Sequence, residues 1–124
     1  MKKTIATERA PQAIGPYSQA IEAGGLIYSS GVIPVDPKTG EIASPAPEAA
    51  RQAFTNLKNL LEDAGTGMDK VIKTTVFIAN MEDFAAINEV YASFFPEPYP
   101  ARSCVEVARL PKDVLLEVEA IAEK

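Results

Sequence analysis

The strongest constraint on the fold lies in residues 100–122, where polar and apolar side chains alternate in two successive runs. Alternation with a period of two is typical of a strand, because successive side chains point to opposite faces. In the first run, residues 102–107, the side chains of Arg102, Cys104 and Glu106 share one face. This run therefore predicts a strand with charged groups along one side.

The second run, residues 115–122, alternates more clearly. Glu117 and Glu119 share one face with Leu115 and Ile121, and the other face is apolar: Leu116, Val118, Ala120 and Ala122. Residues 110–113 contain proline and aspartate, which favour a turn over a ladder position. We therefore expect a hairpin of two strands joined by this turn.

A register that sets Cys104 opposite Glu117 would place an arginine, a thiol and a carboxylate on one surface of the hairpin. Arg102 could then grip a carboxylate, and Glu117 could hold a water molecule. Spacing alone favours a simpler interpretation, because charged side chains on strands are usually solvated. In that interpretation Arg102 pairs with Glu119 at the rim and Glu117 faces solvent.

Upstream, residues 3–6 are a candidate edge strand, and residues 20–30 predict a hairpin around two adjacent glycines. Residues 47–64 carry an apolar stripe at helical spacing, which predicts a first helix that ends at Gly65. Residues 71–78 are rich in β-branched side chains and indicate a central strand.

A second helix is expected after Asn80, a candidate cap, with an apolar face of Phe84, Ile87, Tyr91 and Phe94. The element order β-β-β-α-β-α-β-β predicts one α+β domain, residues 1–124. Its mixed sheet has five to six strands, and both helices pack on one face. The uncovered sheet face carries many apolar groups, and we expect self-association to cover it.

Composition excludes several kinds of chemistry. The 124 residues include no histidine and a single cysteine, which removes the usual general base, any internal disulfide and a zinc cluster. The formal net charge of −5 argues against a broad nucleic-acid surface. No apolar run approaches membrane-spanning length and no signal core is present, so we expect a cytoplasmic protein without a membrane partner.

Three further positions are candidates for a site. Tyr17 follows Gly15 and Pro16 in a loop whose path is restricted by proline, and a packed aromatic role is equally compatible with it. Ser30 and Gly31 end a predicted strand, where small residues let a backbone approach a ligand or mark a bulge. Asn88 lies one helical turn from Phe84, so we expect it to be partly buried and to need partners.

Several stretches together resemble the Rid family, also called the YjgF family, and most of all its RidA branch of enamine/imine deaminases. The matching stretches are residues 13–20, 29–34, 73–77, 100–111 and 116–119. The resemblance covers nearly the whole chain. It implies a chorismate-mutase-like fold and a homotrimer whose sites lie between subunits.

The resemblance also implies a reaction. The substrates would be the enamines 2-aminoacrylate and 2-aminocrotonate and their imine tautomers, which are small-molecule 2-imino acids. The imines would be hydrolysed to 2-keto acids and ammonia without a cofactor or a metal. Arg102 matches the arginine that binds the substrate carboxylate, and Glu117 matches the carboxylate that activates water. Cys104 matches a position that lines the pocket through its backbone, and the other matching pocket positions are Tyr17, Ser30, Gly31 and Asn88.

Two alternatives stay open at this point. An endoribonuclease or translation inhibitor is one, although the acidic charge and the absence of histidine weigh against it. A non-catalytic ligand-binding or chaperone-like trimer is the other, and the presence of both Arg102 and Glu117 weighs against it.

Overall fold

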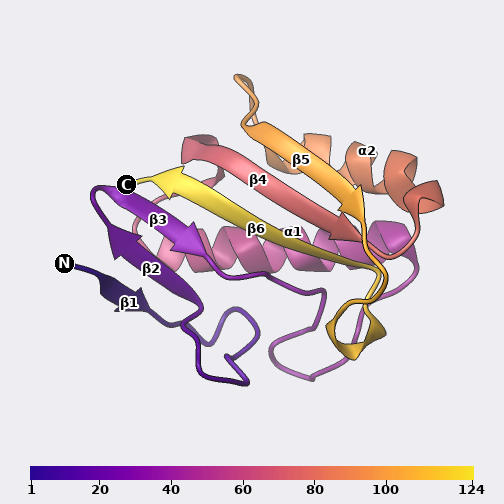
Figure 1. The fold of residues 1–124 in the computed structure, drawn as a ribbon, viewed down its shortest axis with the longest axis horizontal. Helices are drawn as coiled ribbons and strands as arrows, with labels where there is room; N and C mark the ends of the chain where they lie inside the picture. Colours follow the sequence, from indigo (N-terminus) through magenta and orange to yellow (C-terminus); the bar gives the residue numbers. More distant parts are fainter.

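The computed structural model describes residues 1–124 as a six-stranded mixed sheet with two helices behind it (Figure 1). The strand order across the sheet is β1-β2-β3-β6-β4-β5. This architecture confirms the predicted α+β class, with both helices on one face. The strand bounds are β1 (Lys3–Ile5), β2 (Ala20–Ala23), β3 (Leu26–Ser29), β4 (Val71–Ile78), β5 (Ala101–Glu106) and β6 (Leu116–Glu123).

The helices are α1 (Ala46–Asp63) and α2 (Phe84–Phe94). Helix α1 is one residue out of step with the predicted range, and Gly65 adopts the left-handed φ of +89° expected of a residue that ends a helix. Asn80 accepts a hydrogen bond from the backbone N–H of Glu82, so it caps a short 3₁₀ turn that precedes α2 rather than α2 itself.

The expected hairpin of the last two strands is wrong, because β4 lies between them. Strand β4 pairs antiparallel with β6 on one side and parallel with β5 on the other. Helix α2 connects β4 to β5, and a helical crossover is the usual way to join two parallel neighbours. The apolar face of β6 is then placed beneath α1, near the middle of the sheet.

The core lies between the helices and the sheet. Helix α1 buries its apolar stripe completely, with Phe54, Leu57 and Leu61 each at 0% exposure. Phe54 also contacts the aromatic rings of α2, with its centroid 5.5 Å from that of Tyr91 in an edge-to-face arrangement. No helix is both long enough and apolar enough to cross a membrane.

Candidate functional site

The structure places the predicted site residues in two separate groups. We call Asn88, Arg102 and Cys104 the arginine half, which lies on the helix side of the sheet at β5. The glutamate half consists of the four remaining predicted positions, which all line one cavity: Tyr17, Ser30, Gly31 and Glu117. The register that would set Cys104 opposite Glu117 on one surface does not occur, because β4 lies between β5 and β6.

Strand register explains the separation. Thr74 pairs with Arg102 and Val76 pairs with Cys104, and both β4 residues are buried beneath the helices. Paired residues share a face of the sheet. Glu117 instead pairs with Phe77, which alternates with Val76 and therefore faces away from the helices.

The arginine half presents a charged group with no ion-pair partner in the chain, since none of the salt bridges includes Arg102. Its Nη1 donates to Oδ1 of Asn88 at 2.7 Å. Asn88 has the expected partner but is exposed, so the expectation that it is partly buried is wrong. The guanidinium carbon lies 4.7 Å from the ring centroid of Tyr91 and 5.5 Å from that of Phe84. These contacts hold a planar cation at the wall of a pocket of about 410 Å³. A cation held in this way is suited to bind an anion.

Cys104 lies next to this cation on β5 and is partly buried. Burial raises the pKa of the Cys104 thiol, and the nearby charge of Arg102 lowers it by less. The thiol is therefore neutral near neutral pH, and a neutral thiol is a poor nucleophile.

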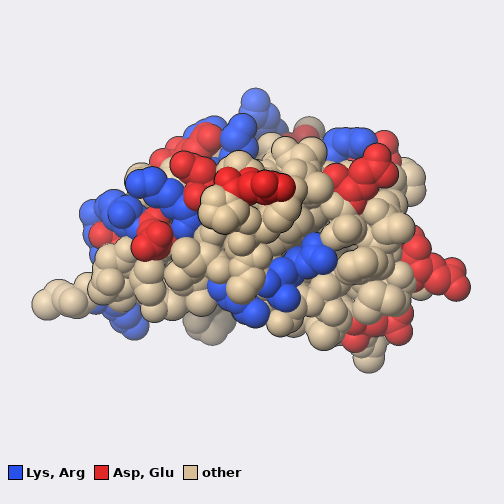
Figure 2. All heavy atoms as spheres, turned by 90° about the horizontal axis from the view of Figure 1, so that it is seen from above, with Lys and Arg blue, Asp and Glu red and all other residues tan.

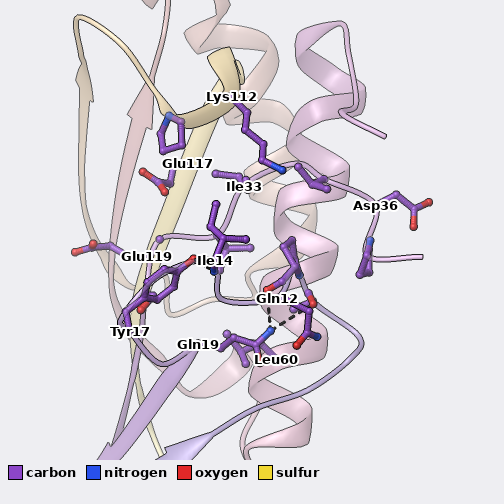
Figure 3. A pocket seen from close by; sticks show the side chains of 18 of the residues that line it. Gln12, Ile14, Tyr17, Gln19, Ile33, Asp36, Leu60, Lys112, Glu117 and Glu119 are labelled. Carbon is purple, nitrogen blue, oxygen red and sulfur yellow. Dashed lines mark hydrogen bonds between the residues drawn. The ribbon is translucent and has the colours of Figure 1, made fainter. Parts of the chain in front are cut away.

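The glutamate half lines a cavity of about 660 Å³ formed by the loop of residues 10–19, the end of β3 and the start of β6 (Figure 3). Figure 3 shows Glu117, Glu119 and Tyr17 along the same wall. Tyr17 is 48% exposed, and its hydroxyl oxygen accepts a 3.4 Å hydrogen bond from the backbone N–H of Ile14.

Gly31 lies directly against Glu117. A Cβ atom at position 31 would be 2.5 Å from Oε2 and 2.6 Å from Cδ of Glu117, so only glycine leaves room for this carboxylate. The neighbouring residues fix the approach, because Val32 and Val118 exchange backbone hydrogen bonds of 2.7 and 3.0 Å.

Ser30 and Gln19 hold the loop that forms the other wall. The Ser30 hydroxyl donates to the carbonyl of Ser18 at 2.6 Å. The side chain of Gln19 is buried, and its amide donates to the carbonyls of Thr7, Ala10 and Pro11. From the sequence, the prolines were expected to fix the path of this loop. The structure shows that the Gln19 side chain also fixes it, and no sequence pattern indicated that role.

The electrostatic environment of Glu117 is unusual for a carboxylate. Burial raises the pKa of Glu117, and the negative charge of the nearby Glu119 raises it further. A carboxylate whose pKa is shifted towards neutrality is a better proton acceptor than an ordinary one.

Two residues that contact Arg102 were treated from the sequence only as core residues, namely Phe84 and Tyr91. Their helical spacing is that of a buried apolar stripe, so it gives no indication that they also contact Arg102. The one signal of such a role is Asn88, a polar residue within the same stripe.

Comparison with known proteins gives consistent findings. The model of the family described as Endoribonuclease L-PSP matches residues 7–124. A Salmonella typhimurium protein named 2-iminobutanoate/2-iminopropanoate deaminase is 54% identical over 125 residues, which cover 98% of each chain. The structure of Escherichia coli TdcF with bound serine matches with a TM-score of 0.94 and 53% identity over 98% of each chain. RidA from the Antarctic bacterium Psychrobacter matches with a TM-score of 0.95 and 42% identity, over 98% of this chain and 99% of that one.

Proposed function

This chain belongs to the Endoribonuclease L-PSP family, and we propose that it hydrolyses small 2-imino acids to 2-keto acids and ammonia. The observation that carries the proposal is the 54% identity with a 2-iminobutanoate/2-iminopropanoate deaminase over almost the whole of both chains. The resemblance to the Rid family stated from the sequence is confirmed by these relatives. The two halves of the candidate site supply groups suited to this reaction.

Arg102 binds the substrate carboxylate in this proposal. Its guanidinium uses one N–H on Asn88 and makes no ion pair within the chain, which leaves an edge free for two parallel hydrogen bonds. Planar, bidentate recognition fixes the orientation of a small substrate as well as its position.

Glu117 activates the attacking water. Water adds to C2 of the protonated imine as the Glu117 carboxylate accepts one of its protons, and a carbinolamine forms. The Glu117 carboxyl then returns this proton to the nitrogen, and the C–N bond breaks as the carboxylate accepts the hydroxyl proton, which releases ammonia and leaves the 2-keto acid. The raised pKa of Glu117 supports its role as the group that accepts and returns the proton.

The two halves come together only between subunits in this proposal, because they lie on opposite faces of one sheet. The face that the helices leave uncovered has exposed apolar side chains, with Tyr28 at 42% and Val105 at 44% exposure. We propose a homotrimer that covers these faces and places the arginine half of one subunit against the glutamate half of the next.

A subunit-mixing experiment tests the shared site. Arg102→Ala and Glu117→Gln are each expected to be inactive, but coexpression of the two should restore activity to about one quarter of the wild-type value, since random mixing leaves that share of interfaces intact. The trimer is checked by light scattering. A stable monomer, or two inactive variants that never complement each other, would contradict the proposal.

The reaction itself is tested by coupling the purified chain to a threonine dehydratase and following 2-oxobutanoate release. The chain should accelerate release beyond spontaneous imine hydrolysis. A rate equal to that of the dehydratase alone would overturn the proposed function.

Gly31→Ala is expected to reduce kcat/KM about a hundredfold while the fold is kept, because displacing a reacting group by about 1 Å has an effect of this order. The added methyl would meet the end of the flexible Glu117 side chain rather than backbone. Gly15→Ala is the matched control, since its Cβ would lie 3.6 Å from the Tyr17 ring in ordinary contact. Equal losses in the two variants would show that the effect is not specific to Glu117.

Glu119→Gln is expected to move the acid limb of the pH profile of kcat/KM to lower pH. The charge of Glu119 raises the pKa of Glu117 in addition to the larger effect of burial, so removing that charge lowers this pKa. The base is then ionised, and the enzyme active, at lower pH. A limb that stays in place would mean that another group controls it.

The endoribonuclease alternative has less support. The face seen in Figure 2 shows basic and acidic side chains interspersed, without a broad basic surface. Together with the net charge of −5, this gives little electrostatic attraction for RNA. RNA cleavage that survives Glu117→Gln would favour a separate ribonuclease activity.

A further inference from the structure

A buried pair of hydroxyl groups lies beneath the arginine half. Oγ1 of Thr74 and the phenolic oxygen of Tyr91 are 2.7 Å apart, and the two residues are 0% and 6% exposed. The other helix-facing residues next to Thr74 on β4 are apolar, Val76 and Ile78. A buried hydroxyl is unfavourable unless it is paired, and an apolar residue would suit this position better for packing alone.

The hydroxyl pair is placed to control the guanidinium. Thr74 and Arg102 are register partners on adjacent strands, so their side chains are neighbours on the same face. Tyr91 reaches over from α2, with its ring centroid 4.7 Å from the guanidinium carbon of Arg102. Asn88, on the same helix, accepts a hydrogen bond from Nη1 at 2.7 Å. Helix α2 therefore contacts both the flat face and one edge of the guanidinium.

The phenol of Tyr91 is in the protonated state that its hydrogen bond with Thr74 requires. Burial raises the pKa of its phenol, so the hydroxyl stays protonated and can share a hydrogen bond with Thr74. A ring fixed at its hydroxyl end cannot tilt freely. Because an exposed arginine otherwise samples many rotamers, a fixed aromatic face limits where its free edge can point.

We propose that Tyr91, locked by Thr74, is a positioning residue that orients Arg102 so that its free edge receives a carboxylate. This inference rests on the proposed function only in taking the ligand to be a small 2-oxo or 2-imino acid. Neither Tyr91 nor Thr74 takes part in the bond-making steps.

Binding of 2-oxobutanoate, followed by calorimetry, separates positioning from catalysis. Tyr91→Leu is expected to weaken binding about tenfold, and Tyr91→Phe, which keeps the ring, by about threefold at most. Thr74→Val is expected to resemble Tyr91→Phe, whereas Thr74→Ser keeps a hydroxyl and should bind normally. In an Arg102→Ala background, Tyr91→Leu should cause no further loss, because the side chain that it positions is absent.

Ile27→Ala is the matched control for folding. Ile27 is completely buried on β3, which β6 and β4 separate from β5 and Arg102. This variant should lower the melting temperature and leave 2-oxobutanoate affinity unchanged. Thermal unfolding of every variant is measured alongside binding.

The outcomes are distinct. Normal binding by Tyr91→Leu, or an equal loss in the wild-type and Arg102→Ala backgrounds, would overturn the positioning role. Normal binding by Thr74→Val would overturn the claim that the Thr74 hydroxyl fixes the Tyr91 ring. If wild-type protein binds 2-oxobutanoate through Arg102 and Tyr91 but does not hydrolyse imines, the proposed function fails and this inference stands. If Tyr91→Leu hydrolyses imines normally and its binding of 2-oxobutanoate is unchanged, the proposed function stands and this inference fails.

Discussion

Glu117→Gln is expected to reduce turnover by roughly 10²- to 10⁴-fold, the range typical of positioned acid–base groups, while binding of 2-oxobutanoate is retained. The amide keeps the shape of the side chain and its fit beside Gly31, but it cannot accept a proton from water. The chain contains no histidine to substitute for it. The loss should therefore appear in kcat rather than in affinity.

Two variants at neighbouring positions test whether the loss of turnover is specific to Glu117. Glu119→Gln removes a carboxylate two residues away on the same strand face, and it should keep most of its turnover near neutral pH. Cys104→Ser should also lose much less, because the neutral thiol is not expected to act as a nucleophile. If Cys104→Ser is inactive and Glu117→Gln is active, a thiol-based mechanism must replace the one proposed here.

Local patterns predicted the elements of this fold well. The stripe of residues 47–64 identified α1 to within one residue at each end, and β-branched content identified β4 as a central strand. These predictions succeed because helical and strand periodicities are properties of neighbouring residues, and burial of one face determines both.

Strand pairing could not be predicted in the same way. Alternation shows which residues of β5 and β6 share a face of their own strand, but it does not show which strand lies alongside. The apolar face of β6 is compatible with pairing to β5 or to β4. Helix α2 decides between them, since it joins β4 to β5 as parallel neighbours and thereby moves β6 to the other edge of β4.

That single change in pairing divides the candidate site. Arg102 then faces the helices and Glu117 faces away from them. The contact between Gly31 and Glu117 depends on a bridge between residues far apart in sequence, Val32 and Val118. No periodic signal predicts a contact of that kind, and the same holds for Tyr91 against Arg102.

The second large effect is expected for Arg102→Lys, which keeps the charge but loses the geometry. The guanidinium satisfies three demands at once in the proposed site: an N–H on Asn88, a flat face on Tyr91 and a free edge for the ligand. An ammonium group is a compact point charge without a planar fork, so it cannot meet all three.

A charge-assisted hydrogen bond contributes roughly 1.5–3 kcal/mol, so the loss of one in Arg102→Lys should lower kcat/KM about ten- to a hundredfold. Affinity for 2-oxobutanoate should fall in parallel, which distinguishes this variant from Glu117→Gln. The corresponding change in the loop after β5, Arg109→Lys, lies outside both halves and is the control, since Arg109 pairs only with Asp113 at the surface. Near-normal kinetics in folded Arg102→Lys with wild-type assembly would remove Arg102 from the site, because a bidentate contact cannot survive the loss of its fork.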